Sequence, residues 1–193
     1  MKYYAVKNGR NIGIYDNWDA CLKEVSNFKG AEYKSFATLE DAQNYLTNND
    51  KIVAYDGPVA YVDGSYKDST KEYSFGVVLL IDGKEIHFKK AFAEDELSSM
   101  RNVAGEIKGA GFIIQYCVNR GIKKLTVYHD YEGISKWYQY EWNAKLFGTK
   151  KYQEFAENVR DDIDVTFIKV KGHSNDKYND LADKLAKAAL GIE

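Results

Sequence analysis

The chain has 193 residues, of which 45% are apolar and 15% aromatic, which is enough for one packed domain or two small ones and excludes a mainly disordered chain. Its 27 Lys and Arg are balanced by 29 Asp and Glu, which excludes an overall positive field that would attract a polyanion. Any contact with nucleic acid must therefore be local.

The start of the chain and its two cysteines bear on its compartment. Residues 1–7 lack the apolar core of a signal peptide, and no stretch of about 18 uncharged apolar residues occurs, so we expect no membrane span. Cys21 and Cys117 fall in apolar helical patterns, which favours reduced core thiols over a disulfide. We expect a cytoplasmic protein and, by default, a monomer.

The first part of the chain has the pattern of a small α/β unit. Its expected elements are a strand at 3–7, an extended piece at 12–15, a helix at about 17–28 and a second helix that ends at about 46. Thr38 and Asp41 have the spacing of a reciprocal cap at the start of that second helix.

A break in this pattern separates the first part from the rest. Residues 47–50 are polar and typical of turns, and the only proline, Pro58, stands just before the next apolar run. We therefore predict a domain at 1–48, a short linker at 49–57 and a second domain at 58–193.

The second domain begins with strands and continues with helices and strands in alternation. After the apolar run that ends at Asp63, two β-rich runs are joined by Asp82-Gly83, which is a hairpin signal. The later elements are a helix at 102–119, a strand at 125–130, helices at 132–142 and 150–161, a strand at 165–170 and a helix at 179–190. The order β-β-β-α-β-α-α-β-α predicts an α/β fold.

Four carboxylates stand in four different local settings of this domain. Asp63 and Asp130 each end an apolar run and should lie at strand ends, where open α/β sheets place their chemistry. Glu106 opens a long helix, and Asp183 lies within the last one. Taken singly, Asp63 could belong to a turn, Asp130 could cap a helix and Asp183 could be solvated. Glu106 shares a helical row with apolar residues, where an unpaired carboxylate is costly.

A bound cation would remove that cost. Carboxylate oxygens suit Mg²⁺ or Mn²⁺, and the lack of clustered His and Cys argues against zinc. Two such ions about 4 Å apart can hold a scissile phosphate, one activating water and the other stabilising the leaving oxygen. The four acids therefore favour metal-dependent cleavage of nucleic acid.

Four blocks carry a family resemblance. They are Tyr61-Val62-Asp63-Gly64-Ser65, Arg101-Asn102-Val103-Ala104-Gly105-Glu106, Val127-Tyr128-His129-Asp130, and Lys171-Gly172-His173 followed by Asn179-Asp180-Leu181-Ala182-Asp183. In order and spacing they closely resemble ribonuclease H type 1. The resemblance implies a mixed five-stranded sheet flanked by helices, and hydrolysis of the RNA strand of RNA/DNA hybrids to 5′-phosphate and 3′-hydroxyl ends. It assigns Asp63, Glu106, Asp130 and Asp183 as ligands of two metal ions.

The resemblance also gives roles to residues around the acids. His173, which by its polar loop alone would be an exposed histidine, would help proton transfer or the release of product and metal. Asn102 would contact the hybrid backbone, with a helix cap as the alternative. Gly64 and Ser65 would offer backbone groups to ribose 2′-hydroxyls.

The first domain carries Tyr4-Ala5-Val6-Lys7-Asn8-Gly9-Arg10, Gly13-Ile14-Tyr15, Trp18, Phe28-Lys29-Gly30-Ala31 and Tyr33-Lys34-Ser35-Phe36-Ala37. It resembles the hybrid-binding domain, or viroplasmin N-terminal domain, found ahead of many ribonucleases H1. By motif position Trp18, Tyr33 and Lys34, with Tyr4 as a further candidate, would contact an RNA/DNA hybrid, and double-stranded RNA is a second candidate partner.

Two departures from the family pattern concern charge. Many members have a second lysine where this chain has Ser35, and residues 1–48 hold six Lys and Arg against six Asp and Glu, so weak binding by this domain is one expectation. Some relatives carry a lysine-rich helix after the third acid, whereas lysines are sparse in 131–142. We expect the first domain to supply substrate affinity if the nuclease domain lacks a basic surface.

Two other classes of function stay open. One is a catalytically silent protein that binds hybrid or double-stranded RNA on the same scaffold, against which the presence of all four acids argues. The other is a relative that acts on DNA, such as a resolvase or integrase, which shares the fold but not the front domain.

Overall fold

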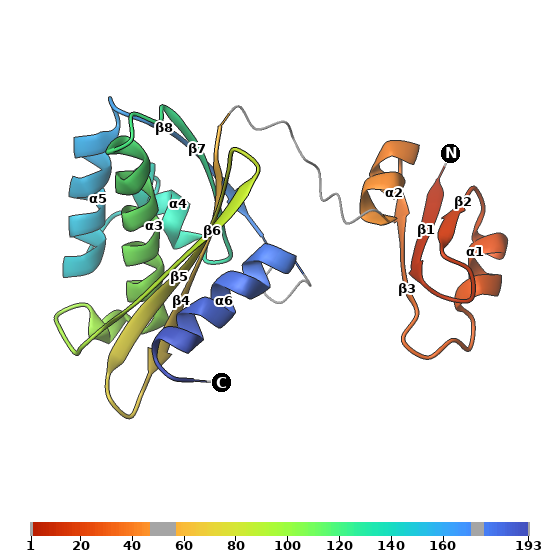
Figure 1. The fold of residues 1–193 in the computed structure, drawn as a ribbon, viewed down its shortest axis with the longest axis horizontal. Helices are drawn as coiled ribbons and strands as arrows, with labels where there is room; N and C mark the ends of the chain where they lie inside the picture. Colours follow the sequence, from red (N-terminus) through yellow and green to blue (C-terminus); the bar gives the residue numbers. More distant parts are fainter. Residues whose placement is uncertain (1, 47–56, 171–175, 193) are drawn as a thin grey trace. The chain divides into compact units, whose positions relative to one another are not determined.

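The computed structural model of the chain divides into two compact units, Met1–Ala54 and Tyr55–Glu193, which we call the N-terminal and the C-terminal unit (Figure 1). The structure describes residues 2–46, 57–170 and 176–192. The predicted domain end at 48, most of the predicted linker and His173 lie outside the described residues. Within the described ranges, no helix combines the length and apolar character that crossing a membrane requires.

The N-terminal unit is a three-stranded antiparallel sheet with two helices. Its strands are β1 (Tyr3–Asn8), β2 (Gly13–Tyr15) and β3 (Glu32–Phe36), in the order β2-β1-β3. Helix α1 (Trp18–Val25) buries Cys21 against Val6 of β1, and α2 (Leu39–Leu46) contacts β1 and β3. The predicted cap of α2 is confirmed, because the Thr38 hydroxyl accepts from the Asp41 amide at 3.1 Å and donates to its carboxylate at 2.8 Å.

The C-terminal unit is built on a mixed five-stranded sheet, as predicted, and its strands lie in the order β6-β5-β4-β7-β8. Its strands are β4 (Val59–Lys67), β5 (Glu72–Ile81), β6 (Lys84–Phe92), β7 (Lys124–His129) and β8 (Asp164–Lys169). The first three are antiparallel, whereas β7 and β8 run parallel to β4. Asp82 and Gly83 both have positive φ, 50° and 70°, which fits the predicted hairpin turn between β5 and β6.

Helices cover both faces of this sheet (Figure 1). The short 3-10 turn η1 (Ser98–Met100) leads into α3 (Asn102–Val118), which packs on β4 and β5, and α4 (Gly133–Tyr138) and α5 (Phe147–Val159) lie beside α3. Helix α6 (Lys177–Ala189) packs on the other face of β4 and β5. In the C-terminal unit the order of helices and strands is the one predicted from the sequence, whereas β3 of the N-terminal unit was not predicted.

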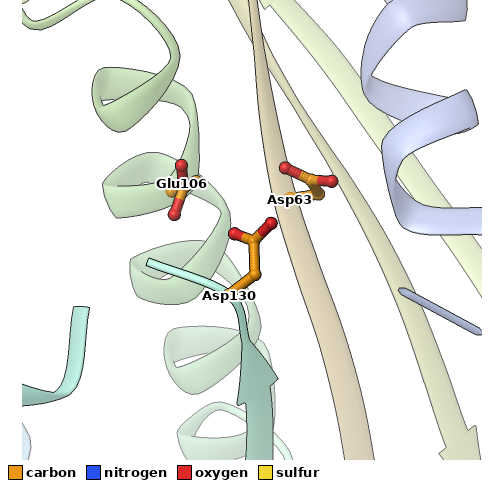
Figure 2. A group of neighbouring side chains, drawn as sticks. All are labelled: Asp63, Glu106 and Asp130. Atoms are coloured by element: carbon orange, nitrogen blue, oxygen red, sulfur yellow. The ribbon is translucent and has the colours of Figure 1, made fainter. Parts of the chain in front are cut away.

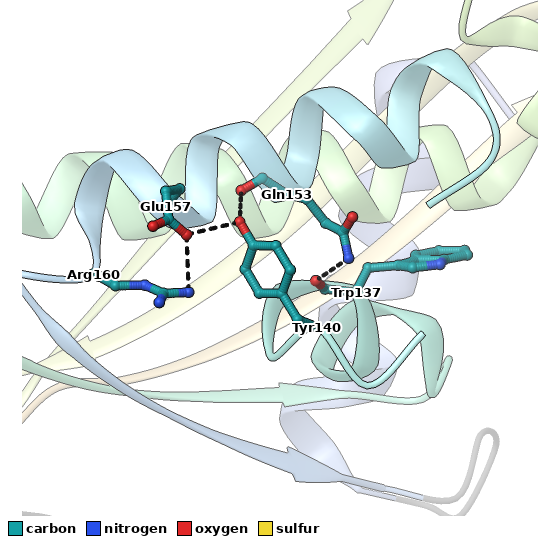
Figure 3. Close-up of polar contacts among 5 residues, drawn as sticks. All are labelled: Trp137, Tyr140, Gln153, Glu157 and Arg160. Carbon is teal, nitrogen blue, oxygen red and sulfur yellow. Dashed lines mark hydrogen bonds and ion pairs between the residues drawn. The ribbon is translucent and has the colours of Figure 1, made fainter. Parts of the chain in front are cut away.

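Helix α4 ends at Tyr138, four residues earlier than predicted, because the chain turns at Tyr140 (Figure 3). Tyr140 has φ 61°, which is uncommon for a bulky residue, and its hydroxyl donates to the carbonyl of Gln153 at 2.8 Å. The Gln153 amide in turn donates to the carbonyls of Trp137 at 3.1 Å and Trp142 at 3.0 Å. One α5 side chain thus holds both ends of the turn.

Glycines set the distance between the sheet and its two main helices. A Cβ on Gly105 of α3 would collide with the carbonyl oxygen of Ser74 in β5, and one on Gly64 of β4 would collide with the carbonyl oxygen of Asn102. On the other face, a Cβ on Gly76 of β5 would collide with a carbonyl oxygen of α6. The helix backbones therefore lie directly against β4, which carries Asp63, and against β5.

Candidate active site

Asp63 lies in the interior of β4, as the fifth of nine residues, and not at a strand end or in a turn as the sequence suggested. The reason is that β4 pairs with β5 as far as Lys67, whereas its pairing with β7 stops at Tyr61 and Tyr128. Asp130 directly follows β7 and does not cap α4, whose N-cap is Glu132. Continuing the parallel register by two residues sets Asp130 opposite Asp63.

Glu106 reaches the same place from the second turn of α3. Its side chain is 1% exposed, and the Asn102 amide donates to its Oε1 at 3.3 Å. Asn102 is not a helix cap, because Arg101, with φ 56°, occupies that position. Among the described residues, Glu106 Oε2 has no hydrogen-bond partner.

Three of the four predicted acids form one cluster (Figure 2). A carboxylate oxygen from each of Asp63, Glu106 and Asp130 lies within 4.8 Å of the other two. In Figure 2 the Asp130 carboxylate stands between those of Asp63 on β4 and Glu106 on α3. Three elements that are distant in sequence thus converge on a single point.

The fourth acid, Asp183, lines the same pocket without joining the cluster of three. Its Oδ2 pairs with Lys187 Nζ at 2.7 Å, one turn further along α6. The pocket measures about 250 Å³ and is lined mainly by acidic and amide side chains, namely Asp63, Gly64, Asn102, Glu106, Asp130, Asn179, Asp180, Asp183 and Lys187. Five acids in one pocket make a strongly anionic site.

Burial and mutual repulsion raise the pKa of two of these acids. Burial, then the charges of Asp130 and Asp183, raises the pKa of Asp63 to about 7, although the Gly64 amide, which donates to its Oδ1 at 2.7 Å, acts in the opposite direction. Burial, then the charges of Asp130 and Asp63, raises the pKa of Glu106 to about 9. Although Lys187 also lines the pocket, the crowded carboxylates of Asp63 and Glu106 therefore favour a bound proton or cation.

These residues fit a divalent cation. Glu106 Oε2 is buried and has no partner among the described residues, and an ionised carboxylate in such a position needs a counter-charge. Hard oxygen donors from Asp63, Glu106 and Asp130 suit Mg²⁺ or Mn²⁺. Asp183 is near enough to act on the pKa of Asp63 and could join as a fourth ligand.

The remaining predicted site residues have mixed placements. Gly64 lines the pocket, and so does Asn102, whereas Ser65 is buried on β4 and is absent from the lining. His173 lies outside the described residues. Asn179 and Lys187 line the pocket but were not singled out from the sequence, although each stands four residues from Asp183, one helical turn away.

In the N-terminal unit, three of the predicted contact residues form an aromatic row. The Trp18 ring lies between Tyr4, at 5.6 Å, and Tyr33, at 5.7 Å between ring centroids. Trp18 is 39% exposed and Tyr33 45% exposed, so the row is accessible. Lys34 is on the opposite face of β3, with its Nζ 5.6 Å from the ring of Phe36.

Comparison with known proteins agrees with this arrangement. A family described as the ribonuclease H1 N-terminal domain matches residues 2–46, and the RNase H family matches residues 57–191. A ribonuclease H of Schizosaccharomyces pombe is 25% identical, and the alignment covers 96% of both chains. A ribonuclease H of Crithidia fasciculata is 53% identical over 45 residues, 23% of this chain and 9% of that one.

Solved structures show the same fold for the C-terminal unit. The RNase H1 of the archaeon Halobacterium salinarum matches with a TM-score of 0.58 at 18% identity, covering 69% of this chain and 97% of that one. An RNase H1 isolated from compost, solved in complex with an RNA/DNA hybrid, matches with a TM-score of 0.54 at 16% identity, covering 69% of this chain and 99% of that one.

A mixed sheet with an acidic pocket beside its central strand defines a nuclease of the RNase H fold. Since the RNase H match spans well over half of its length, the chain belongs to the RNase H family. It carries an RNase H domain preceded by a ribonuclease H1 N-terminal domain.

Proposed function

We propose that the protein hydrolyses the RNA strand of RNA/DNA hybrids with two divalent cations, Mg²⁺ or Mn²⁺, leaving 5′-phosphate and 3′-hydroxyl ends. The observation that carries the proposal is the cluster of Asp63, Glu106 and Asp130, whose carboxylate oxygens approach within 4.8 Å in a pocket of an RNase H domain. The hybrid as substrate is supported by family membership and by the hybrid bound to the compost RNase H1.

The chain's own residues would hold and orient the metal ions. Asp63, Glu106, Asp130 and Asp183 would be the ligands, and Asn102 would fix the Glu106 carboxylate through its 3.3 Å hydrogen bond. When bound, the cations would supply activation of water and stabilisation of the leaving oxygen. His173 would move a proton or assist product release, a role that an imidazole can serve.

The N-terminal unit would bind the hybrid. Its row of the partly buried Tyr4 and the exposed Trp18 and Tyr33 offers apolar faces for sugar rings, and Lys34 offers a cation for phosphate. Joining this unit to the nuclease would raise the local concentration of substrate at the acidic pocket. We propose a domain organisation of 1–48, 49–57 and 58–193, and a monomer.

Cleavage of three labelled duplexes tests the proposal. Purified protein is incubated with RNA/DNA, RNA/RNA and DNA/DNA, with Mg²⁺ or with EDTA, and product ends are mapped. We expect internal cuts in the RNA strand of the hybrid only, and only with the metal. Binding without cleavage would instead identify a silent scaffold, and cleavage of DNA/DNA would identify a relative that acts on DNA.

A further inference from the structure

Helix α6 presents three polar side chains to the acidic pocket, one on each successive turn. Asn179, Asp183 and Lys187 are spaced four residues apart, and all three line the pocket. Lys187 is paired with Asp183, so these two satisfy each other. Asn179 is the most N-terminal of the three, and neither of these two residues is a hydrogen-bond partner of its Oδ1 in the described part of the chain.

The Asn179 side chain is buried and only partly satisfied. The residue is 3% exposed, and its Oδ1 has no hydrogen-bond partner among the described residues. A buried amide oxygen without a partner is costly, which points to a hydrogen-bond donor that enters the pocket. Glu106 Oε2, on another wall of the same pocket, is in the same condition.

We infer that Asn179 is a positioning residue that accepts a hydrogen bond from a water molecule carried by the divalent cation in this pocket. Mg²⁺ keeps several of its waters when it binds proteins, and those waters need acceptors. Groups that hold such outer waters contribute strongly to metal affinity. The inference rests on the proposed metal-dependent function.

The amide suits this role better than another carboxylate would. Five acids, Asp180 among them, already line the pocket, so a sixth would add repulsion in the metal-free protein. An amide supplies an acceptor oxygen with no charge. It also leaves the ligand positions to Asp63, Glu106 and Asp130, whose oxygens already converge.

Binding of Mn²⁺ to the full-length, metal-free protein, without nucleic acid, tests the inference. Asn179→Leu removes the acceptor while keeping the branching and the number of heavy atoms of the side chain, and Asn179→Asp keeps an oxygen and adds charge. Glu106→Gln is the reference for a ligand, and Asn143→Leu, at an exposed position in the α4–α5 connection, is the matched control. Mn²⁺ affinity is measured by electron paramagnetic resonance, and Tm is measured in EDTA.

We expect Asn179→Leu to weaken Mn²⁺ binding about 10-fold without lowering Tm in EDTA, while Asn143→Leu changes neither. Asn179→Asp should bind Mn²⁺ at least as tightly as the wild type, which keeps the test decisive if the leucine variant fails to fold. Wild-type affinity in Asn179→Leu, or weaker binding by Asn179→Asp, would overturn the inference. If Glu106→Gln also binds normally, the proposed metal site itself is wrong.

Discussion

Gly105 of α3 lies directly against the carbonyl oxygen of Ser74 in β5, with no space for a side chain between helix and strand. Glu106 is the next residue, so the position of its carboxylate follows from contact between two backbones. Packed side chains can repack when a neighbour changes, but a backbone contact cannot. The close contact that Gly105 allows therefore fixes how deep Glu106 lies in the pocket.

We expect Gly105→Ala to lower the free energy of unfolding by about 1–3 kcal/mol and to reduce cleavage, because the added methyl group must push α3 away from β5. Urea unfolding and hybrid cleavage measure the two effects. Gly111→Ala is the matched control on the same helix, because its Cβ would make only an ordinary 3.9 Å contact with Phe155. The free energy of unfolding of Gly111→Ala should rise by about 0.5–1 kcal/mol. Equal losses of stability in both variants would contradict the argument.

The metal-free protein should lose stability as pH rises above the ordinary carboxyl range. The folded-state pKa of Asp63, about 7, and of Glu106, about 9, exceed the ordinary values of 3.8 and 4.5. Between the ordinary and the raised value the folded state binds more protons than the unfolded state, so stability falls with rising pH. Tm measured in EDTA from about pH 5 to about pH 9 checks this sign.

Two further measurements separate the causes of this pH dependence. Glu106→Gln should flatten the decline at the alkaline end, because the amide cannot ionise. Adding Mn²⁺ at about pH 8 should raise Tm of the wild type, since the ion replaces the protons on the carboxylates. A Tm in EDTA that rises with pH would show that the acids are not buried together as described.

Asp63→Asn should abolish cleavage and leave hybrid binding intact. The amide keeps the shape of the side chain but removes a charged ligand at the centre of the cluster. Gel cleavage with Mg²⁺ and fluorescence anisotropy with a labelled hybrid measure the two properties. Asp68→Asn, on an exposed aspartate outside the pocket, is the control and should cleave normally. Normal turnover by Asp63→Asn would refute the ligand role.

Removal of residues 1–57 should raise KM for a hybrid with a smaller effect on kcat, because the deleted unit binds and the retained unit cuts. In the full chain, Trp18→Ala should raise KM in the same direction, since Trp18 is the centre of the aromatic row. Ile12→Ala, at a residue 68% exposed in the same unit, is the control. An unchanged KM on deletion would place the affinity in the nuclease domain.

The turn after α4 should depend on Gln153. Gln153→Ala removes two hydrogen bonds to the carbonyls of Trp137 and Trp142, and we expect a loss of about 1–3 kcal/mol in the free energy of unfolding. Gln115→Ala removes one exposed hydrogen bond to Asn119, four residues further along the chain, and should lower the free energy of unfolding much less. Urea unfolding of both variants measures the difference, and similar losses would mean that the turn is not held by Gln153.

Periodicity and caps predicted the elements well because those signals are local. The cap at Thr38 and the hairpin at Asp82 each depend on a few neighbouring residues, and the structure has both. The environment of Asp63 depends on a distant partner. Its polar neighbours resemble a turn, but pairing with β5 extends the strand to Lys67. The site forms beside Asp63 because the pairing of β4 with β7 stops two residues earlier, at Tyr61.

The roles of Asn102 and Asn179 were harder to predict for a related reason. Asn102 resembles a cap, but Arg101 adopts the positive φ that ends the preceding turn, which leaves the Asn102 amide to contact Glu106. Asn179 stands among ordinary helix residues, and only the packing of α6 on the sheet brings it into the pocket.

Tyr33 and Lys34 are neighbours in an outer strand and so point to opposite sides of the small sheet. A duplex that contacts both residues must therefore lie across the edge of that sheet. Ser35, where many relatives have lysine, is on the same side of the sheet as Tyr33. Because serine carries no charge, it adds no cation beside the aromatic ring of Tyr33, and the cation of Lys34 lies on the opposite face of β3. Higher ionic strength should then weaken the contact of Lys34 with phosphate and leave the contacts of the aromatic rings unchanged.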